Sequence, residues 1–352
     1  MTDRKLAEIL ANATPFALPL AKPFRGVTHR EGVILAGPSG FGEFAPFLEY
    51  DDETCARWLA SAVEAAYGSW PDSRRGEVPV NAIIPALAPH DAAAMAYRGF
   101  VGDGCRTVKI KVAEVGQTLD DDVARVEAVR SAQQSAAVPN PRIRVDANGG
   151  WSLADATVAL RELDRAAGGL EYVEQPCRTL AELAELRRVV SVPIAADESI
   201  RTAGDPIRAV QQQAADIVVV KVPPLGGVNL ARQVVGAAGV PVVVSGAMDS
   251  AVGLAAGIAL AASLEELPYA CGLGTGALLA RDLIANPLRP TRGVLGVTRA
   301  SPDQMMLATA EAELGAPRGQ WWLERLTRAW DAGAGSLVGA GVGCASAMLL
   351  SC

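Results

Sequence analysis

Short apolar runs alternate along the chain with stretches whose apolar positions recur at helical spacing. From about residue 78 there are eight such runs, most of them rich in β-branched residues, at 78–84, 107–112, 142–147, 170–175, 192–198, 216–222, 240–245 and 269–274. Runs of this length and composition predict buried strands, and most end in polar, Gly or Pro residues before a helical stretch begins. Eight strand–helix units in succession predict an α/β fold, a closed (β/α)8-type barrel rather than an open sheet.

The residues on either side of these units follow other patterns. Residues 16–47 contain short apolar stretches broken by Gly and Pro, which is typical of antiparallel strands, and residues 51–67 show the spacing of an amphipathic helix. We therefore predict an α+β capping domain over residues 1–77, the barrel over 78–300, and helices over 301–333 that pack back on the cap. The apolar but Gly-rich residues 334–352 predict a flexible tail rather than a membrane span, which needs about 20 strongly apolar residues.

Composition and charge narrow the class of protein. Half of the 352 residues are hydrophobic and 20% are charged, so the chain can bury a large core and is neither disordered nor fibrous. The formal net charge of −7 disfavours a nucleic-acid or membrane partner and favours a small molecule. Six scattered Cys residues without a CxxC pair, and an N-terminus without an export signal, predict reduced thiols in a cytoplasmic protein. We expect a monomer or a small homo-oligomer.

Three acidic residues end consecutive runs that should be apolar. Asp146, Glu174 and Asp197 follow one another at intervals of about one strand–helix unit. They are expected at the carboxyl ends of neighbouring strands, where barrel enzymes place their active sites. Single acids of this kind pair with an Arg or cap a helix, but three that converge need a cation. An all-oxygen donor set without His or Cys selects Mg²⁺ first and Mn²⁺ second.

Lysines occupy two further strands. Lys109 and Lys111 alternate along the second run and so point to the same side, and Lys221 ends the sixth run. Strands two and six are opposite each other in an eight-stranded barrel, so Lys111 and Lys221 should face across the mouth. A lysine becomes a base when its pKa falls, and the Lys109 ammonium and a metal would both lower it. A lysine base beside a cation suits removal of a proton α to a carboxylate, with an enediolate as intermediate.

Two other classes of function remain open on these residues. Lys221 at the end of the sixth strand would also suit a Schiff-base aldolase, for which three convergent acids would be superfluous. The chain could also be a metal-binding barrel without turnover.

Five motifs together resemble the enolase superfamily, in its muconate lactonizing subgroup. They are VKIKV at 108–112, VDANGGW at 145–151, EYVEQP at 171–176, ADES at 196–199 and VVVKVPPLGG at 218–227. The resemblance implies Mg²⁺ ligands at Asp146, Glu174 and Asp197. It also implies that Lys111 is the base and Lys221 the opposing acid/base or cation. Asn148, two residues beyond the first ligand, is expected to contact the metal ligands rather than the metal itself.

Missing features and two further segments restrict the reaction. His29 and His90 lie outside the sixth and seventh runs, so a His/Asp base is absent, and GLGTG at 272–276 lacks the Asp-x-Asp pair of dipeptide epimerases. Residues 29–53 and 242–257 resemble the subgroup's dehydratases of menaquinone biosynthesis. These convert 2-succinyl-6-hydroxy-2,4-cyclohexadiene-1-carboxylate to 2-succinylbenzoate. An N-acylamino acid racemase or a cycloisomerase on the same framework remains an alternative, because two opposed lysines also suit two-base proton transfer.

Loops after the last strands and in the cap are expected to touch the substrate. Ser245 and Gly246 follow the seventh run, and Gly274 and Thr275 follow the eighth, where hydroxyl and N–H groups would meet the succinyl carboxylate. In the cap we expect Phe16, Leu18 and Arg25 to close over the substrate.

Overall fold

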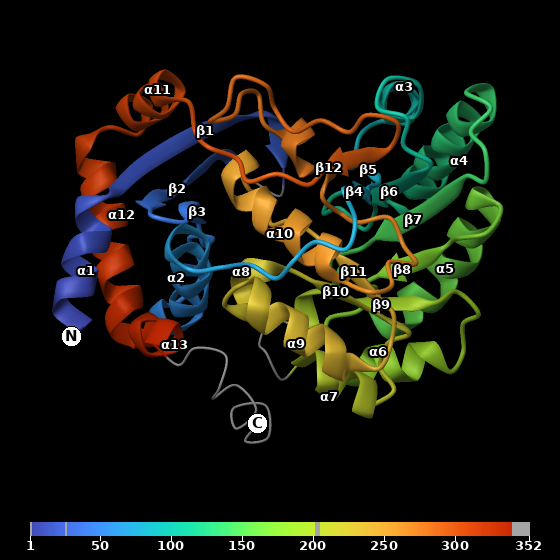
Figure 1. Ribbon diagram of the computed structural model, residues 1–352. Coiled ribbons are helices and arrows are strands. Elements are labelled where there is room, and N and C mark those ends of the chain that lie inside the picture. Colours follow the sequence, from blue (N-terminus) through green and yellow to red (C-terminus); the bar gives the residue numbers. More distant parts are fainter. Residues whose placement is uncertain (1, 25–26, 201–204, 340–352) are drawn as a thin grey trace.

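The chain forms a cap built from both of its ends and a barrel built from its middle. The computed structural model describes residues 2–24, 27–200 and 205–339. In Figure 1 the blue N-terminal and red C-terminal elements lie together on one side of the molecule, and the barrel strands and their helices fill the other side.

The cap is an antiparallel sheet covered by helices. Its N-terminal elements are α1 (Thr2–Ala11), β1 (Ala13–Phe24), β2 (Val27–Gly37), β3 (Gly40–Phe44) and α2 (Asp52–Tyr67). Its C-terminal elements are α11 (Gln304–Leu314), α12 (Ala316–Ala329), a π-turn at Trp330–Ala334 and α13 (Gly335–Gly339). Trp58 of α2 and Trp322 of α12 share one buried cluster, which joins the two ends of the chain. Within the predicted flexible tail, α13 is helical and Val338 packs on this cluster, whereas residues 340–352 lie outside the described residues.

Seven parallel strands form the barrel sheet, in the order of the sequence. They are β5 (Ala82–Ile84), β6 (Thr107–Lys111), β7 (Arg142–Asp146), β8 (Tyr172–Glu174), β9 (Ile194–Ala196), β10 (Ile217–Val220) and β11 (Val242–Val244). The helices that follow them are α3 (Pro89–Val101), α4 (Leu119–Ser135), α5 (Leu153–Ala167), α6 (Leu180–Arg187), α7 (Asp205–Gln211), α8 (Val222–Leu225), α9 (Val228–Ala238) and α10 (Ala251–Ser263). The predicted α/β barrel with an α+β cap is confirmed.

The first and last predicted runs differ from expectation. Residues 269–274 form no regular strand; instead Gly272 bridges Ser245 and Cys271 bridges Val80, which closes the barrel through isolated contacts. A Cβ on Gly272 would lie 2.6 Å from the Ser245 Oγ and 3.2 Å from the Ser245 Cβ, so a larger residue there would force the Ser245 side chain to move. In the first run, β4 (Glu77–Pro79) leaves the barrel and pairs antiparallel with β12 (Val294–Gly296).

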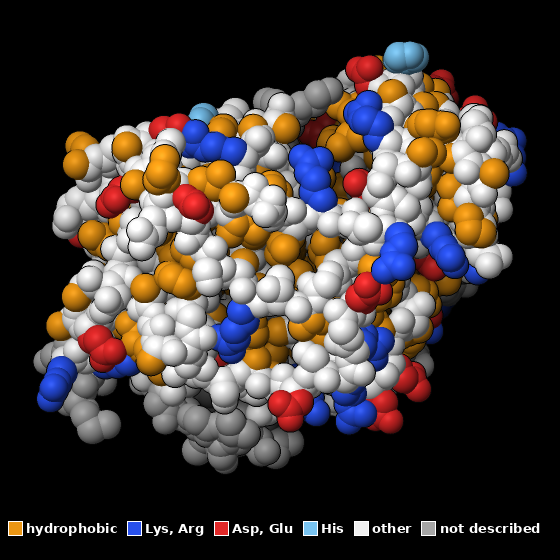
Figure 2. Space-filling view, turned by 45° about the horizontal axis from the view of Figure 1, so that its top comes forward, with side chains coloured by type: hydrophobic (Ala, Val, Ile, Leu, Met, Phe, Trp, Pro, Cys, Tyr) orange, Lys and Arg blue, Asp and Glu red, His pale blue; other side chains and the backbone are white. Residues whose placement is uncertain are grey.

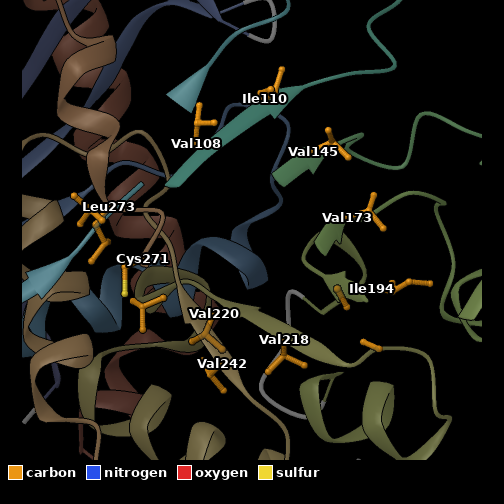
Figure 3. Close-up of a cluster of buried hydrophobic side chains, with 14 of the residues drawn as sticks. Val108, Ile110, Val145, Val173, Ile194, Val218, Val220, Val242, Cys271 and Leu273 are labelled. Carbon is orange, nitrogen blue, oxygen red and sulfur yellow. The ribbon is translucent and has the colours of Figure 1, made fainter. Parts of the chain in front are cut away.

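Strand alternation separates the core from the site. Alternate residues such as Val108, Val145 and Val218 belong to the cluster between the strands and the helices, part of which is drawn in Figure 3. The residues between them face the barrel interior, where Tyr172 and Val219 belong to a separate small cluster. A polar residue in this second phase therefore ends up inside the barrel.

Helix starts follow from local sequence. The Thr118 side chain accepts from the Asp121 N–H while the Asp121 carboxylate accepts from Thr118, and Thr179 and Glu182 repeat this capping box at α6. These caps fix where each helix leaves the preceding strand end.

The surface charges, the lengths of the helices and the cysteines bear on what the composition predicts about partners and thiols. On the face shown in Figure 2, Lys and Arg side chains are spread among Asp and Glu rather than gathered in one basic patch. Within the described residues no helix is long and apolar enough to cross a membrane. Cys55, Cys105, Cys177 and Cys271 are buried free thiols.

Candidate active site

A cavity lies at the carboxyl ends of the barrel strands and reaches the cap. Of the residues predicted for the site, it is lined by Lys109, Lys111, Asp146, Asn148, Glu174, Asp197, Lys221, Ser245, Gly246 and Thr275. Phe47 from the cap and Met248 from the loop after β11 complete part of its wall. The structure thus brings the three acids and three lysines into one place.

Strand register explains why the charged groups meet. Lys111 pairs with Asp146 across β6 and β7, and Asp146 pairs with Glu174 across β7 and β8. Glu174 pairs with Ala195, so Asp197 lies two residues further along on the same side of the next strand. The side chains of Asp146 and Glu174 are each only 1% exposed.

Each lysine forms an ion pair with a different set of carboxylates. The Lys109 Nζ lies 2.7 Å from Glu174 Oε1 and 3.2 Å from Asp146 Oδ2, so it bridges both acids. The Lys111 Nζ lies 2.5 Å from Asp146 Oδ2. The Lys221 Nζ donates to Asp197 Oδ1 at 2.6 Å.

Burial and charge shift the pKa values of the central groups. Burial acts to lower the pKa of Lys109, but Glu174 and Asp146 outweigh it and hold the pKa above its usual value. Burial acts to raise the pKa of Asp146, but Lys111 and Lys109 hold it well below its usual range. For Glu174, burial and the charge of Asp146 raise the pKa to about 7. Lys109 is therefore a fixed cation rather than a proton acceptor.

The acids match a hard divalent cation by the chemistry of their donors. Three buried carboxylates on adjacent strand ends offer only oxygen, and the raised pKa of Glu174 reflects its burial and, after that, the crowding of negative charge by Asp146. As arranged, however, no three His, Cys, Asp or Glu side chains among the described residues form a metal-binding group. The ammonium groups of Lys109, Lys111 and Lys221 contact these carboxylates instead.

Asn148 contacts the predicted base as well as the first acid. Its Oδ1 accepts from the Lys111 Nζ at 2.8 Å, and its N–H donates to Asp146 Oδ1 at 3.1 Å. Its Nδ2 donates to Glu198 Oε1 at 3.0 Å, and its φ of +47° is one that asparagine tolerates better than most residues. Asn148 was expected to support the metal ligands, and it also orients Lys111.

Gln175 is a site residue that sequence reasoning missed. It is fully buried directly after Glu174, and its Oε1 accepts from the Asp197 N–H at 2.8 Å and from the Ser199 N–H at 3.2 Å. Its Nε2 donates to the Cys177 carbonyl at 2.8 Å. The available signal was a polar amide next to a strand-end acid, in a run that should be apolar. Gln175 therefore ties the end of β8 to the backbone of Asp197.

The loops after β11 and Cys271 meet the expectations only in part. The Gly246 N–H donates to the Gly272 carbonyl at 3.0 Å, and Gly246 lines the cavity, so its contact with a substrate stays a prediction. Gly246 also provides space, because a Cβ there would lie 3.0 Å from the Thr275 Oγ1. The Thr275 hydroxyl is buried without a hydrogen-bond partner in the described chain, and Ser245 Oγ donates weakly to Gly272 at 3.3 Å. Gly274 does not line the cavity and packs against the Asn81 carbonyl.

The predicted cap contacts need correction. Phe16 and Leu18 are fully buried in a cluster beneath the cap sheet, because they lie on the inward face of β1, and they do not line the cavity. Arg25 lies outside the described residues. Among the described residues of the cap, Phe47 reaches the cavity; it follows β3 in the segment FGEFAPF.

Taken together, the fold and the site define a capped barrel enzyme with acids and lysines at its mouth. The family described as Enolase C-terminal domain-like matches residues 91–302, and Enolase N-terminal domain-like matches residues 16–66. The muconate lactonizing enzyme of Pseudomonas fluorescens, complexed with muconolactone, has a similar structure. The TM-score is 0.74 at 21% identity, over 85% of this chain and 97% of that one.

Curated relatives are much closer in sequence. The o-succinylbenzoate synthase of Thermobifida fusca is 52% identical over 313 residues, which is 87% of this chain and 96% of the relative. That of Mycobacterium tuberculosis (strain H37Rv) is 52% identical over 312 residues, 88% of this chain and 91% of the relative. The chain therefore belongs to the enolase superfamily and, within it, to the family of these synthases.

Proposed function

We propose that the chain catalyses the o-succinylbenzoate synthase reaction, in which 2-succinyl-6-hydroxy-2,4-cyclohexadiene-1-carboxylate loses water to give 2-succinylbenzoate. The chain is an enzyme of the lyase class, as its relatives at 49–52% identity support. The observation that carries the site assignment is the meeting of Lys111, Lys221 and three buried carboxylates in one cavity. The activity serves menaquinone biosynthesis.

Lys111 is the base in this proposal. Its neutral amine takes the proton from the ring carbon that bears the carboxylate, and the electron pair moves into the carboxylate. Asn148 and Asp146 hold the Lys111 Nζ in place at the cavity. The carbon–oxygen bond at the hydroxyl-bearing carbon then breaks, and the protonated Lys111 gives its proton to the departing hydroxide. Water leaves and the ring becomes aromatic.

Lys221 acts as a cation. Its pairing with Asp197 holds the ammonium at the cavity wall, where it can lie against the substrate ring and stabilise negative charge. Asp146, Glu174 and Asp197 would hold a divalent cation, Mg²⁺ first and Mn²⁺ second, as superfamily members generally do. That ion supplies positive charge where the substrate carboxylate gains electron density. The Thr275 hydroxyl lines the cavity without a hydrogen-bond partner among the described residues, and in this proposal it would donate to the succinyl carboxylate.

The test follows the absorbance of the cyclohexadiene substrate with purified protein and Mg²⁺. We expect loss of the diene that EDTA abolishes and that vanishes in Lys111→Ala. Lys5→Ala is the matched control, because Lys5 pairs with Glu8 on the cap helix α1 away from the cavity and should leave the rate unchanged. No conversion by folded, metal-loaded wild-type protein would reject the proposal.

The second candidate is an N-acylamino acid racemase, favoured by two lysines in one cavity on strands β6 and β10. Incorporation of deuterium at the α-carbon of an N-succinylamino acid in D₂O, without diene conversion, would put it first. For either reaction the partner is a small carboxylate, and we propose a cytoplasmic monomer or small homo-oligomer, which size-exclusion chromatography with light scattering would test.

A further inference from the structure

One buried arginine of the cap touches two apolar residues of the cavity wall, one from the cap and one from the barrel. Arg30 lies on β2 and is 3% exposed. Its Nε donates to the Met248 carbonyl at 3.2 Å, and its Nη2 donates to the Ala45 carbonyl. Its guanidinium carbon lies 4.5 Å from the centroid of the Phe47 ring. Phe47 belongs to the cap and Met248 to the barrel, and both line the cavity.

The barrel loop that Arg30 contacts is strained. Met248 has a φ of +63°, a left-handed conformation that costs a non-glycine residue about 1 kcal/mol or more. Such a conformation persists only where the surroundings hold it. Arg30 binds its carbonyl from the cap, and Asp249 accepts from the Ala247 N–H at 2.7 Å within the loop.

Further contacts fix the frame around this arginine. The Glu43 carboxylate of β3 accepts from the Ser250 N–H at 3.1 Å, at the start of α10. Arg30 lies close enough to Glu43 and Asp249 for its charge to act on both. Arg325 donates to the Phe47 carbonyl at 2.7 Å and so holds the backbone there. The backbone at Phe47 and the start of α10 are thus held by other residues, and Arg30 is the group that contacts both the Phe47 ring and the Met248 carbonyl.

We propose that Arg30 is a positioning residue, which sets the spacing of Phe47 and Met248 and thereby the fit of the cavity around the uncharged part of the substrate. The proposal rests on the function proposed above for the identity of that substrate. Arg30 contacts no reacting group, and Lys111 and Asp197 are positioned separately by Asn148 and Gln175. Loss of Arg30 should therefore weaken binding more than it slows the chemical step.

The experiment compares Arg30→Met, Arg30→Lys and the control Arg299→Met. Arg299 also joins the cap to the end of the barrel, but it donates to the Ser39 and Ala65 carbonyls at 2.7 and 2.9 Å rather than contacting Phe47 or Met248. The measurements are KM and kcat for the diene, the Kd of 2-succinylbenzoate, Tm, and hydrogen–deuterium exchange over residues 45–48 and 245–250.

For Arg30→Met we expect KM and Kd to rise roughly tenfold with kcat within about threefold of wild type, and faster exchange in both segments. Arg30→Lys keeps the charge and should recover part of the binding, whereas Arg299→Met should lower Tm without changing KM. A KM that stays constant in Arg30→Met, or a parallel loss of kcat and Tm like that of a structural variant, would overturn the proposal. If wild-type protein does not convert the diene, the proposed function fails, while exchange in the two segments still decides whether Arg30 positions them.

Discussion

Lys109 and Lys111 are two residues apart on one strand and serve different purposes because their partners differ. Lys109 lies between two carboxylates that hold it protonated, whereas Lys111 shares Asp146 with Lys109 and has the neutral amide of Asn148 on another side. A lysine is made into a fixed charge or a candidate base by what its neighbours offer. The K-x-K spacing alone does not distinguish the two roles.

The raised pKa of Glu43 predicts how the free energy of unfolding changes with pH. Burial and the nearby Asp249 raise its pKa from 4.5 to about 7. Between these values the folded chain keeps a proton that the unfolded chain has released, so the free energy of unfolding should fall as pH rises from about 4.5 to about 7 and then level off. Glu43→Gln cannot release this proton, so it should gain stability relative to wild type across that interval.

The measurement is urea unfolding in EDTA at pH 5 to 8, taken as the difference between Glu43→Gln and wild type. Using the difference matters, because Glu174 also has a raised pKa and contributes to both curves. Glu49→Gln, at an exposed position after β3, is the control for the loss of one negative charge. A difference between Glu43→Gln and wild type that does not change with pH would contradict the assignment.

Among the strands, a residue at the end of one strand positions a residue at the end of its neighbour. Gln175 holds the backbone of Asp197 from the neighbouring strand, so one amide places a carboxylate that it does not itself touch. We expect Gln175→Ala to weaken Mg²⁺ or Mn²⁺ binding by about 10- to 100-fold, since groups that orient ligands typically contribute this much. Isothermal titration with each metal measures it. Gln212→Ala, exposed after α7, should bind as wild type does, and unchanged affinity in Gln175→Ala would refute the role.

The strands and helices could be predicted from the sequence because apolar positions recur every second residue in half-buried strands and at helical spacing in helices. Strand residues alternate between core and interior, so Lys111 and Asp146 stood out as charges in the interior phase of apolar runs. The eighth run misled, because Gly272 permits a close backbone contact that propagates no strand. Phe47 and Arg30 could not be predicted as site residues, because their place depends on how the cap docks on the barrel. No local pattern encodes that docking.

In the whole molecule, Arg144 ties β7 to the part of the barrel where isolated bridges replace a regular strand. It is fully buried on β7, and its Nη1 donates across the interior to the Ala270 carbonyl at 2.7 Å, beside the residues where isolated bridges replace a strand. Its Nε lies 2.5 Å from the Glu171 carboxylate. Arg144→Met leaves these partners without their cation and should lower the free energy of unfolding by about 3–5 kcal/mol.

Arg142→Met is the matched control for this prediction. Arg142 faces the same Glu171 at 3.7 Å, but its side chain is 60% exposed, so its loss should cost less than about 1 kcal/mol. Urea unfolding at neutral pH compares the two variants. Equal effects would mean that Arg144 adds nothing beyond a surface ion pair.

Because the cap is assembled from α1 to α2 and from α11 to α13, its core joins segments that are synthesised before and after the barrel. Trp58 emerges early but has to wait for Trp322 until every barrel strand has been synthesised. All strands of the barrel are therefore synthesised before the second half of the cap. Until then, the first half of the cap exposes apolar surface. Phe47 and Arg30 reach their final places only at the last step, so the charged mouth of the barrel exists before the wall that shapes it.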